Sequence, residues 1–94
     1  MAMETSAWDV SEYLQSEADV AAYLNEVLAE GDLGLLQAAL GDVAKARGMS
    51  DIAAKAGVGR ESLYKSLSEN GNPSFSTIRK VTEALGLQLR FTAA

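Results

Sequence analysis

Residues 60–65 contain a cluster of polar side chains whose hydrogen-bonding groups can read nucleic-acid bases. An arginine fork can donate two hydrogen bonds to a guanine, and a carboxylate can accept one from the amino group of a cytosine. A lysine can contact a base or a phosphate, or can pair with an acidic residue four positions before it. Serine and tyrosine side chains suit phosphate oxygens or thymine methyl groups. The candidate residues are Arg60, Glu61, Ser62, Tyr64 and Lys65.

Residues on either side of this cluster can hold a phosphate backbone. Gly59 precedes the expected helix, whose first backbone N–H groups can bind a phosphate oxygen. Asn70 and Asn72 follow it, and a turn explains these two asparagines as well as a backbone contact does. The arginine and the glutamate that open the cluster also fit the solvated start of a helix. The ring of Tyr64 has packing against the next helix as an equal alternative.

The spacing of small and apolar residues predicts that a helix-turn-helix positions the cluster. Counting from residue 49, the fifth residue is Ala53, whose small side chain lets two helices cross closely, and the ninth is Gly57, where the turn needs a positive φ. The fifteenth, Leu63, anchors the second helix. Ser66 stands where an apolar residue is usual, and Leu67 can replace it after a slight rotation of the helix. The remaining apolar positions of the motif are Ile52, Ala56 and Val58.

Capping residues and apolar periodicity predict the surrounding elements as an all-α domain. Asp9 and Glu12 indicate a short helical turn over 10–15 in an N-terminal extension. We expect an acidic helical extension over residues 1–31 and a DNA-binding domain over 32–94, which together form one compact unit. The five main helices are expected from Ser16 to Gly31, Asp32 to Gly48, Ser50 to Ala56, Arg60 to about Ser68, and Ser74 to Gly86.

The C-terminal segment 87–92 alternates apolar and polar residues, which predicts a short β-strand. A single strand in a helical chain leaves its backbone groups without a partner, so the same strand of a second copy would pair with it. The sequence therefore predicts a homodimer joined through Leu87, Leu89 and Phe91. The alternative is an irregular tail whose leucines cover the core.

Composition excludes several classes of site. The chain has 94 residues, enough for one domain, and contains neither cysteine nor histidine. Disulfides, thiolate zinc sites, cysteine nucleophiles and imidazole bases are therefore absent. We expect no cofactor, no metal and no enzymatic activity. Nor does the sequence show an apolar run long enough to span a membrane or a signal peptide, so the cytoplasm is the expected location.

Charge is strongly segregated along the chain, although its net value is −5. Residues 1–44 contain nine acidic residues and no lysine or arginine, whereas residues 45–94 contain all eight basic residues and four acidic ones. The basic half can face phosphates while the acidic half faces water or a basic partner. Double-stranded DNA is therefore an expected partner despite the acidic net charge.

Two resemblances narrow this interpretation. The run AAKAGV over residues 53–58 resembles the lambda and Cro-like phage repressors, which implies a lambda-repressor-like fold. Almost the whole chain, from about Trp8 to Phe91, is similar to the HigA-type addiction module antidotes. The segments that carry this second resemblance are DVSEYL (9–14), AAYL (21–24), AALGDVAKARGMS (38–50), RESLYK (60–65) and GNP (71–73).

The resemblances also imply partners and site residues. An antidote of this type pairs with a RelE-like toxin, usually one that cleaves mRNA, and represses the operon that encodes both. Phage repressors often carry a phosphate-binding glutamine where this chain has Met49, so Ser50 is the expected substitute, and Lys55 joins the candidate DNA-binding set. Two-fold repressors place their recognition helices about one helical turn of DNA apart.

An acidic surface over residues 9–32 would complement a basic toxin and speed its capture. The aromatic side chains of Trp8, Tyr13 and Tyr23 are the candidate anchors for this contact, with packing on the chain's own core as the alternative. Three other functions remain open at this point. They are a solitary prophage-type repressor without a toxin, an interaction module that has lost DNA binding and, least favoured, an enzyme.

Overall fold

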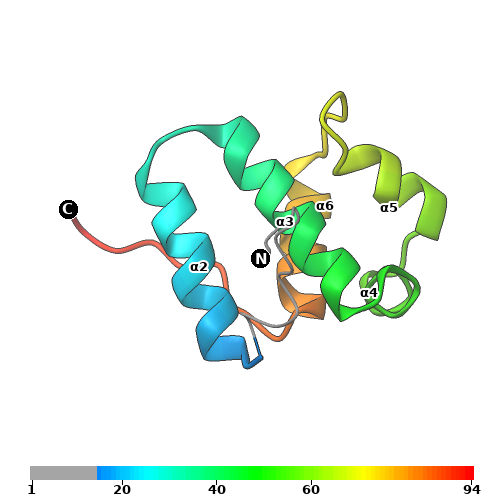
Figure 1. The fold of residues 1–94 in the computed structure, drawn as a ribbon, viewed down its shortest axis with the longest axis horizontal. Coiled ribbons are helices and arrows are strands. Elements are labelled where there is room, and N and C mark those ends of the chain that lie inside the picture. The colour runs from blue at the N-terminus through cyan, green and yellow to red at the C-terminus, as the bar shows by residue number, and fades with distance from the viewer. Residues whose placement is uncertain (1–14) are drawn as a thin grey trace, which may run out of the picture.

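The computed structural model describes residues 15–94 and contains five helices within them (Figure 1). The expected turn over 10–15, together with Trp8 and Tyr13, lies outside or at the edge of these residues. No helix in the described part is long and apolar enough to cross a membrane. The helices are α2 (Glu17–Ala29), α3 (Leu33–Arg47), α4 (Met49–Ala56), α5 (Arg60–Ser66) and α6 (Phe75–Ala84).

Three of the predicted N-caps are confirmed. The Ser16 hydroxyl accepts a hydrogen bond from the backbone N–H of Asp19 at 3.1 Å. The Asp32 carboxylate accepts from the N–H groups of residues 34 and 35 at 2.9 and 3.2 Å, and the Ser74 hydroxyl accepts from Thr77 at 3.1 Å. Each side chain accepts hydrogen bonds from backbone N–H groups that have no partner inside the helix. These capping residues therefore determine where the three helices begin.

The predicted cap at Ser50 is wrong. Helix α4 begins at Met49, and Gly48 with φ of 99° serves both as the end of α3 and as the N-cap of α4, without a side-chain cap. A single glycine makes this sharp turn because an L side chain rarely adopts such a φ. The early start buries Met49 in the core and leaves Ser50 exposed in the first turn of α4.

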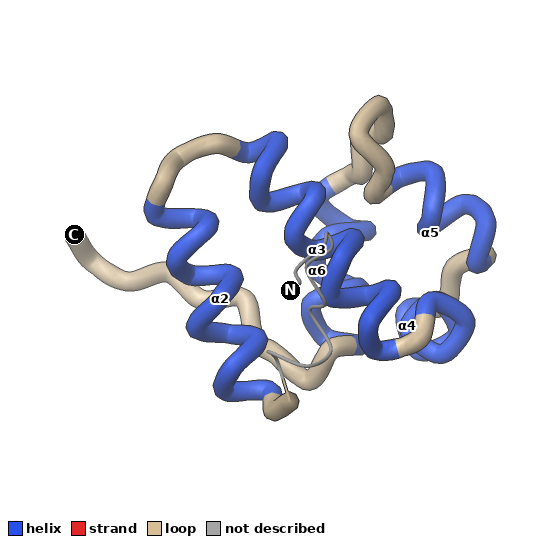
Figure 2. Tube along the Cα trace, in the orientation of Figure 1, coloured by secondary structure: helices blue, strands red, loops and turns tan. Residues whose placement is uncertain are grey.

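A single apolar core lies where the five helices meet. Helix α2 packs against α3, and α4 packs against both α6 and α5. The side chain of Leu67 is buried, as the predicted rotation requires, while Ser66 is only half-buried. Figure 2 shows the same arrangement, with α4 and α5 at the end of the molecule farthest from the C-terminus. The cluster consists of Val20, Leu40, Val43, Ala44, Met49, Ile52, Ala53, Leu63, Leu67, Val81 and Leu85.

The predicted C-terminal strand is wrong. Residues 87–94 form no strand, and the described part of the chain contains no other strand that could pair with them. The backbone N–H of Leu87 instead donates to the carbonyl of Thr82 at 3.1 Å, and its side chain packs against the core. Leu89 is 49% exposed and Phe91 is fully exposed. The alternative of an irregular tail whose leucines cover the core therefore holds for Leu87 but not for Leu89.

One long-range contact holds the loop after α5. The side-chain amide nitrogen of Gln37 lies 2.6 Å from the carbonyl oxygen of Ser68 and 2.9 Å from that of Gly71. An added Cβ at Gly71 would overlap the carbonyl oxygens at the end of α5, so this loop returns very close to the helix. Gln37 thus ties the middle of α3 to the residues that follow the candidate cluster.

We predict that Gln37→Glu lowers the free energy of unfolding by about 1 kcal/mol, because the isosteric carboxylate has no N–H to donate and leaves two carbonyls unpaired. Urea denaturation followed by circular dichroism measures the change. Asn70→Asp is the matched control, since Asn70 is exposed and the substitution likewise replaces an amide by a carboxylate. Equal losses in both variants would show that charge, and not the loop contact, is responsible.

Candidate nucleic-acid interface

Helices α4 and α5 and the turn between them are compatible with the predicted helix-turn-helix. Gly57 follows Ala56, the last residue of α4, and its φ of 73° is left-handed. The N–H of Val58 then donates to the carbonyl of Ala53 at 3.0 Å, and α5 begins at Arg60 directly after Gly59. The turn is short and its backbone is hydrogen-bonded, so the orientation of α5 is fixed by α4 and by the burial of Leu63.

The predicted cluster lies on the exposed face of α5. Arg60, Glu61, Ser62, Tyr64 and Lys65 are all exposed, as is Gly59 before them. Four of them, together with Ser68, line one shallow hollow on the surface. In the part of the chain that the structure describes, Glu61 and Lys65 form no ion pair. Both side chains are therefore available to a ligand.

A cation from another helix lies over this surface. The Lys45 ammonium, in the last turn of α3, is 4.9 Å from the centre of the Tyr64 ring. A cation at this distance over an aromatic face is attracted to the ring. Tyr64 remains 46% exposed, so it does not pack away against the next helix. Sequence reasoning missed Lys45, because nothing in the local pattern brings α3 beside α5.

The other candidate DNA contacts are less closely grouped. Lys55 is paired with Asp51 at 3.2 Å and lines a hollow between α4 and α6. Asn70 and Asn72 are exposed in the loop that Gln37 holds. The structure therefore brings the α5 residues together and places the two asparagines after them, while the ammonium of Lys55 is directed elsewhere.

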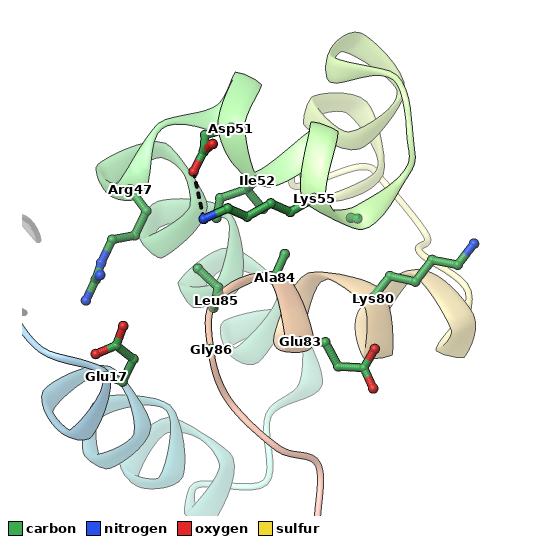
Figure 3. A pocket seen from close by; sticks show the side chains of 11 residues that line it. Glu17, Arg47, Asp51, Ile52, Lys55, Lys80, Glu83, Ala84, Leu85 and Gly86 are labelled. Carbon is green, nitrogen blue, oxygen red and sulfur yellow. Dashed lines mark ion pairs between the residues drawn. The ribbon is translucent and has the colours of Figure 1, made fainter.

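The hollow that Lys55 lines has a mixed charge (Figure 3). Three carboxylates and three cations line it together with apolar residues from α4 and α6. One terminal nitrogen of Arg47 is buried there without a hydrogen-bond partner. Among residues 15–94 no group of three or more acidic residues is arranged to hold a metal ion. The charged lining residues are Glu17, Arg47, Asp51, Lys55, Lys80 and Glu83.

Helix α2 presents an acidic face on a different part of the surface. Asp19, Glu26 and Glu30 follow one another at intervals of seven and four residues, which puts them on one side of the helix, and all three are exposed. Tyr23 is half-buried and packs against the core. Burial, reinforced by the negative charge of Asp42, raises the pKa of Tyr23 above its ordinary value of 10.0. The burial of Tyr23 therefore favours packing on the chain's own core over the role of an exposed anchor for a partner.

Tyr23 is predicted to ionise above the ordinary tyrosine pKa of 10.0. The pKa of Tyr23 is higher in the folded state than in the unfolded state. The contribution of its neutral form to the free energy of unfolding is therefore complete below pH 10 and is lost as the pH rises through the folded pKa. Asp42→Asn is expected to lower the pKa of Tyr23 partway, because burial remains when the carboxylate is removed. Absorbance of tyrosinate against pH measures this, with Tyr23→Phe identifying the transition. A Tyr23 pKa that rises in Asp42→Asn would contradict the assigned cause.

One family model and one curated relative match nearly the whole chain. The model of a family described as "Probable addiction module antidote protein" matches residues 4–93. An uncharacterised protein of Haemophilus influenzae is 50% identical over 90 residues, which cover 96% of this chain and 93% of that protein. No solved structure matches significantly.

Proposed function

The chain belongs to the probable addiction module antidote family, and from this premise we propose that it is a HigA-type antitoxin that neutralises a RelE-like toxin and represses its own operon. Family membership implies a toxin partner of some kind. We further propose that the toxin is RelE-like, that the chain binds operator DNA and that its fold is lambda-repressor-like. The observation that carries repression is the row of exposed polar residues on α5, held by a buried leucine and a tight turn.

The exposed face of α5 supports docking in the major groove. In a helix-turn-helix the second helix enters that groove with its N-terminal residues toward the base edges. Arg60 and Glu61 occupy the first turn of α5, and Lys65 follows one turn later. We assign base contacts to the first two and a base or phosphate contact to the third. Phosphate contacts are assigned to Gly59, Ser62 and Tyr64, with Ser50, Lys55, Asn70 and Asn72 at the periphery.

The acidic face of α2 supports capture of a basic toxin. A toxin that binds RNA carries positive charge, and complementary charge across an interface speeds association. Residues 1–31 would supply this surface and residues 32–94 the DNA contacts. The two parts still fold together, because Val20 of α2 is only 1% exposed and belongs to the common core. Trp8 and Tyr13 stay candidate anchors outside the described residues.

The decisive experiment measures binding of the purified chain to a labelled duplex from its own upstream region, across a series of salt concentrations. A scrambled duplex is the comparison. Selective binding that weakens steeply with salt is expected, because lysine and arginine release counterions from the phosphates. Equal binding to both duplexes, or none, would refute repression by the free protein.

Toxin binding is tested by co-purification with the product of the neighbouring gene. Deleting residues 1–31 would remove Val20 from the core, so neutralising Asp19, Glu26 and Glu30 to their amides is the better variant. The amide variant is expected to keep its fold and to capture the toxin more slowly. Selective DNA binding in a chain without any toxin partner would instead favour a solitary prophage-type repressor.

A further inference from the structure

A second hollow lies beside α5 and connects it to α3. Tyr64 and Ser68 line both this hollow and the hollow on α5 described above, so the two hollows share an edge. Lys45, in the last turn of α3, and Met49, in the first turn of α4, line the second hollow only. The end of α3 therefore reaches the flank of the candidate recognition surface.

The ammonium group of Lys45 is held from one side and is open on the other. Its nitrogen lies 4.9 Å from the centre of the Tyr64 ring, and the Lys45 side chain is exposed. Within residues 15–94 it forms no ion pair, although Asp42, three residues earlier on α3, lines the same hollow. A ring attracts a cation through its face, whereas an ammonium carries three N–H donors. The contact with Tyr64 therefore directs the charge and leaves donors for an anion.

The first turn of α4 offers little to a phosphate on this flank. In a helix-turn-helix the first helix crosses the phosphate backbone while the second enters the groove. Met49 is apolar and only 6% exposed, so its side chain can donate no hydrogen bond there. Ser50 is exposed but lines neither of the two hollows. Lys45 shares a hollow with Met49 and supplies both a charge and donors at this place.

We propose that Lys45 contacts a phosphate of the DNA backbone at the flank of α5, and that the ring of Tyr64 positions it there. This inference rests on the DNA binding proposed above and adds to it a residue from outside the helix-turn-helix. A compact ammonium charge suits a phosphate, and phosphate contacts fix the orientation of a protein on the duplex. The carboxylates of Asp32, Asp42 and Glu69 also line the second hollow and repel a phosphate. The contact therefore belongs at the edge shared with the hollow on α5, where Tyr64 lies.

Salt titration of Lys45→Met on the labelled duplex from the chain's own upstream region tests the proposal. Methionine keeps a long unbranched side chain and removes the charge. The slope of the logarithm of the association constant against the logarithm of salt concentration is expected to become shallower by about one, because one phosphate contact fewer releases fewer counterions. Base preference is expected to stay unchanged, since a phosphate contact carries no sequence information. Lys45 is exposed, so circular dichroism is expected to show unchanged helix content.

Lys80→Met is the matched control, because it removes the same charge from another helix. Lys80 is exposed on α6 and lines neither of the two hollows beside α5. Its substitution is expected to leave the salt slope nearly unchanged. Equal slopes in Lys45→Met and Lys80→Met, with selective binding retained, would overturn the proposal and leave the proposed function intact. An unsubstituted chain that binds no duplex would overturn both, so the two failures are distinguishable.

Two substitutions of Tyr64 separate its ring from its hydroxyl group. Tyr64→Leu removes the ring and is expected to make the salt slope shallower in the unsubstituted chain but to change it less in Lys45→Met, where the charge is already absent. Tyr64→Phe keeps the ring, so its effect is expected to be the same in both backgrounds. Equal effects of Tyr64→Leu in both backgrounds would overturn the positioning role of the ring.

Duplexes that each carry one uncharged methylphosphonate linkage test the contact itself. Neutralising the phosphate that Lys45 contacts is expected to weaken binding of the unsubstituted chain and to leave the binding of Lys45→Met unaffected, because the two changes remove the same interaction. If every linkage that matters to the unsubstituted chain matters equally to Lys45→Met, then Lys45 contacts no phosphate and the proposal is wrong.

Discussion

Replacing Leu63 with alanine is expected to lower the free energy of unfolding by about 2–5 kcal/mol. The side chain is 1% exposed and lies within the common core. Alanine would remove its transfer free energy and leave a cavity that the surrounding helices fill only in part. Because Leu63 is the buried residue of α5 itself, the loss is expected to fall on the element that carries the candidate cluster. Urea denaturation followed by circular dichroism measures it.

Tyr64→Ala is the control for this substitution. Tyr64 is the next residue of the same helix but is 46% exposed, and its contact with the Lys45 ammonium accounts for about 0.5–1 kcal/mol. Both variants introduce alanine into the same helix, and they differ chiefly in the burial of the side chain that is removed. If both lowered stability equally, Leu63 would not be the anchor that its burial indicates. Lys45→Met would test the ring contact separately.

Local capping chemistry made most of the helix boundaries predictable. Ser16, Asp32 and Ser74 each accept backbone hydrogen bonds two or three residues ahead, an interaction that depends only on neighbouring residues. Gly57 likewise adopts the left-handed conformation that its place in the motif requires. Helix caps and tight turns can be predicted from the sequence, because they depend on neighbouring residues and not on a distant partner.

The features that the sequence did not reveal depend on distant contacts. Residues 87–92 alternate like a strand, yet a strand needs a neighbour, and the described part of the chain provides none. Ser50 is a good capping residue, but the turn at Gly48 and the burial of Met49 moved the start of α4 forward. Lys45 reaches the Tyr64 ring only because the tertiary fold brings the end of α3 near α5. In each case tertiary packing overrides a local preference.

The candidate site was predictable to the extent that one helix contains it. Arg60, Glu61, Tyr64 and Lys65 line one hollow because intervals of one, three and four residues bring side chains together on a helix, while Leu63 is turned inward. The acidic face of α2 follows in the same way from the positions of its carboxylates. Lys45 and Gln37 add support from α3, and no pattern along the chain links them to α5.

Arg60→Ala is expected to relax base preference at one position of each half-site, at a cost of about 1–3 kcal/mol in selective binding. The guanidinium is exposed at the first position of α5, where a recognition helix points toward base edges. Binding to a set of duplexes with single base changes measures the effect. Preference is expected to disappear at one position while the remaining positions keep theirs.

Arg79→Ala separates this contact from a loss of positive charge. Arg79 is exposed on α6, pairs with Glu83 at 3.4 Å and belongs to neither the hollow on α5 nor the loop that follows it. Both variants lower the net charge by one, so any shared weakening reports general attraction to phosphates, which carries no base preference. Only the difference in base preference between the two variants measures the contact of Arg60 with a base. Identical base preferences in Arg60→Ala and the unsubstituted chain would remove Arg60 from the interface and leave Glu61 and Lys65 to carry selectivity.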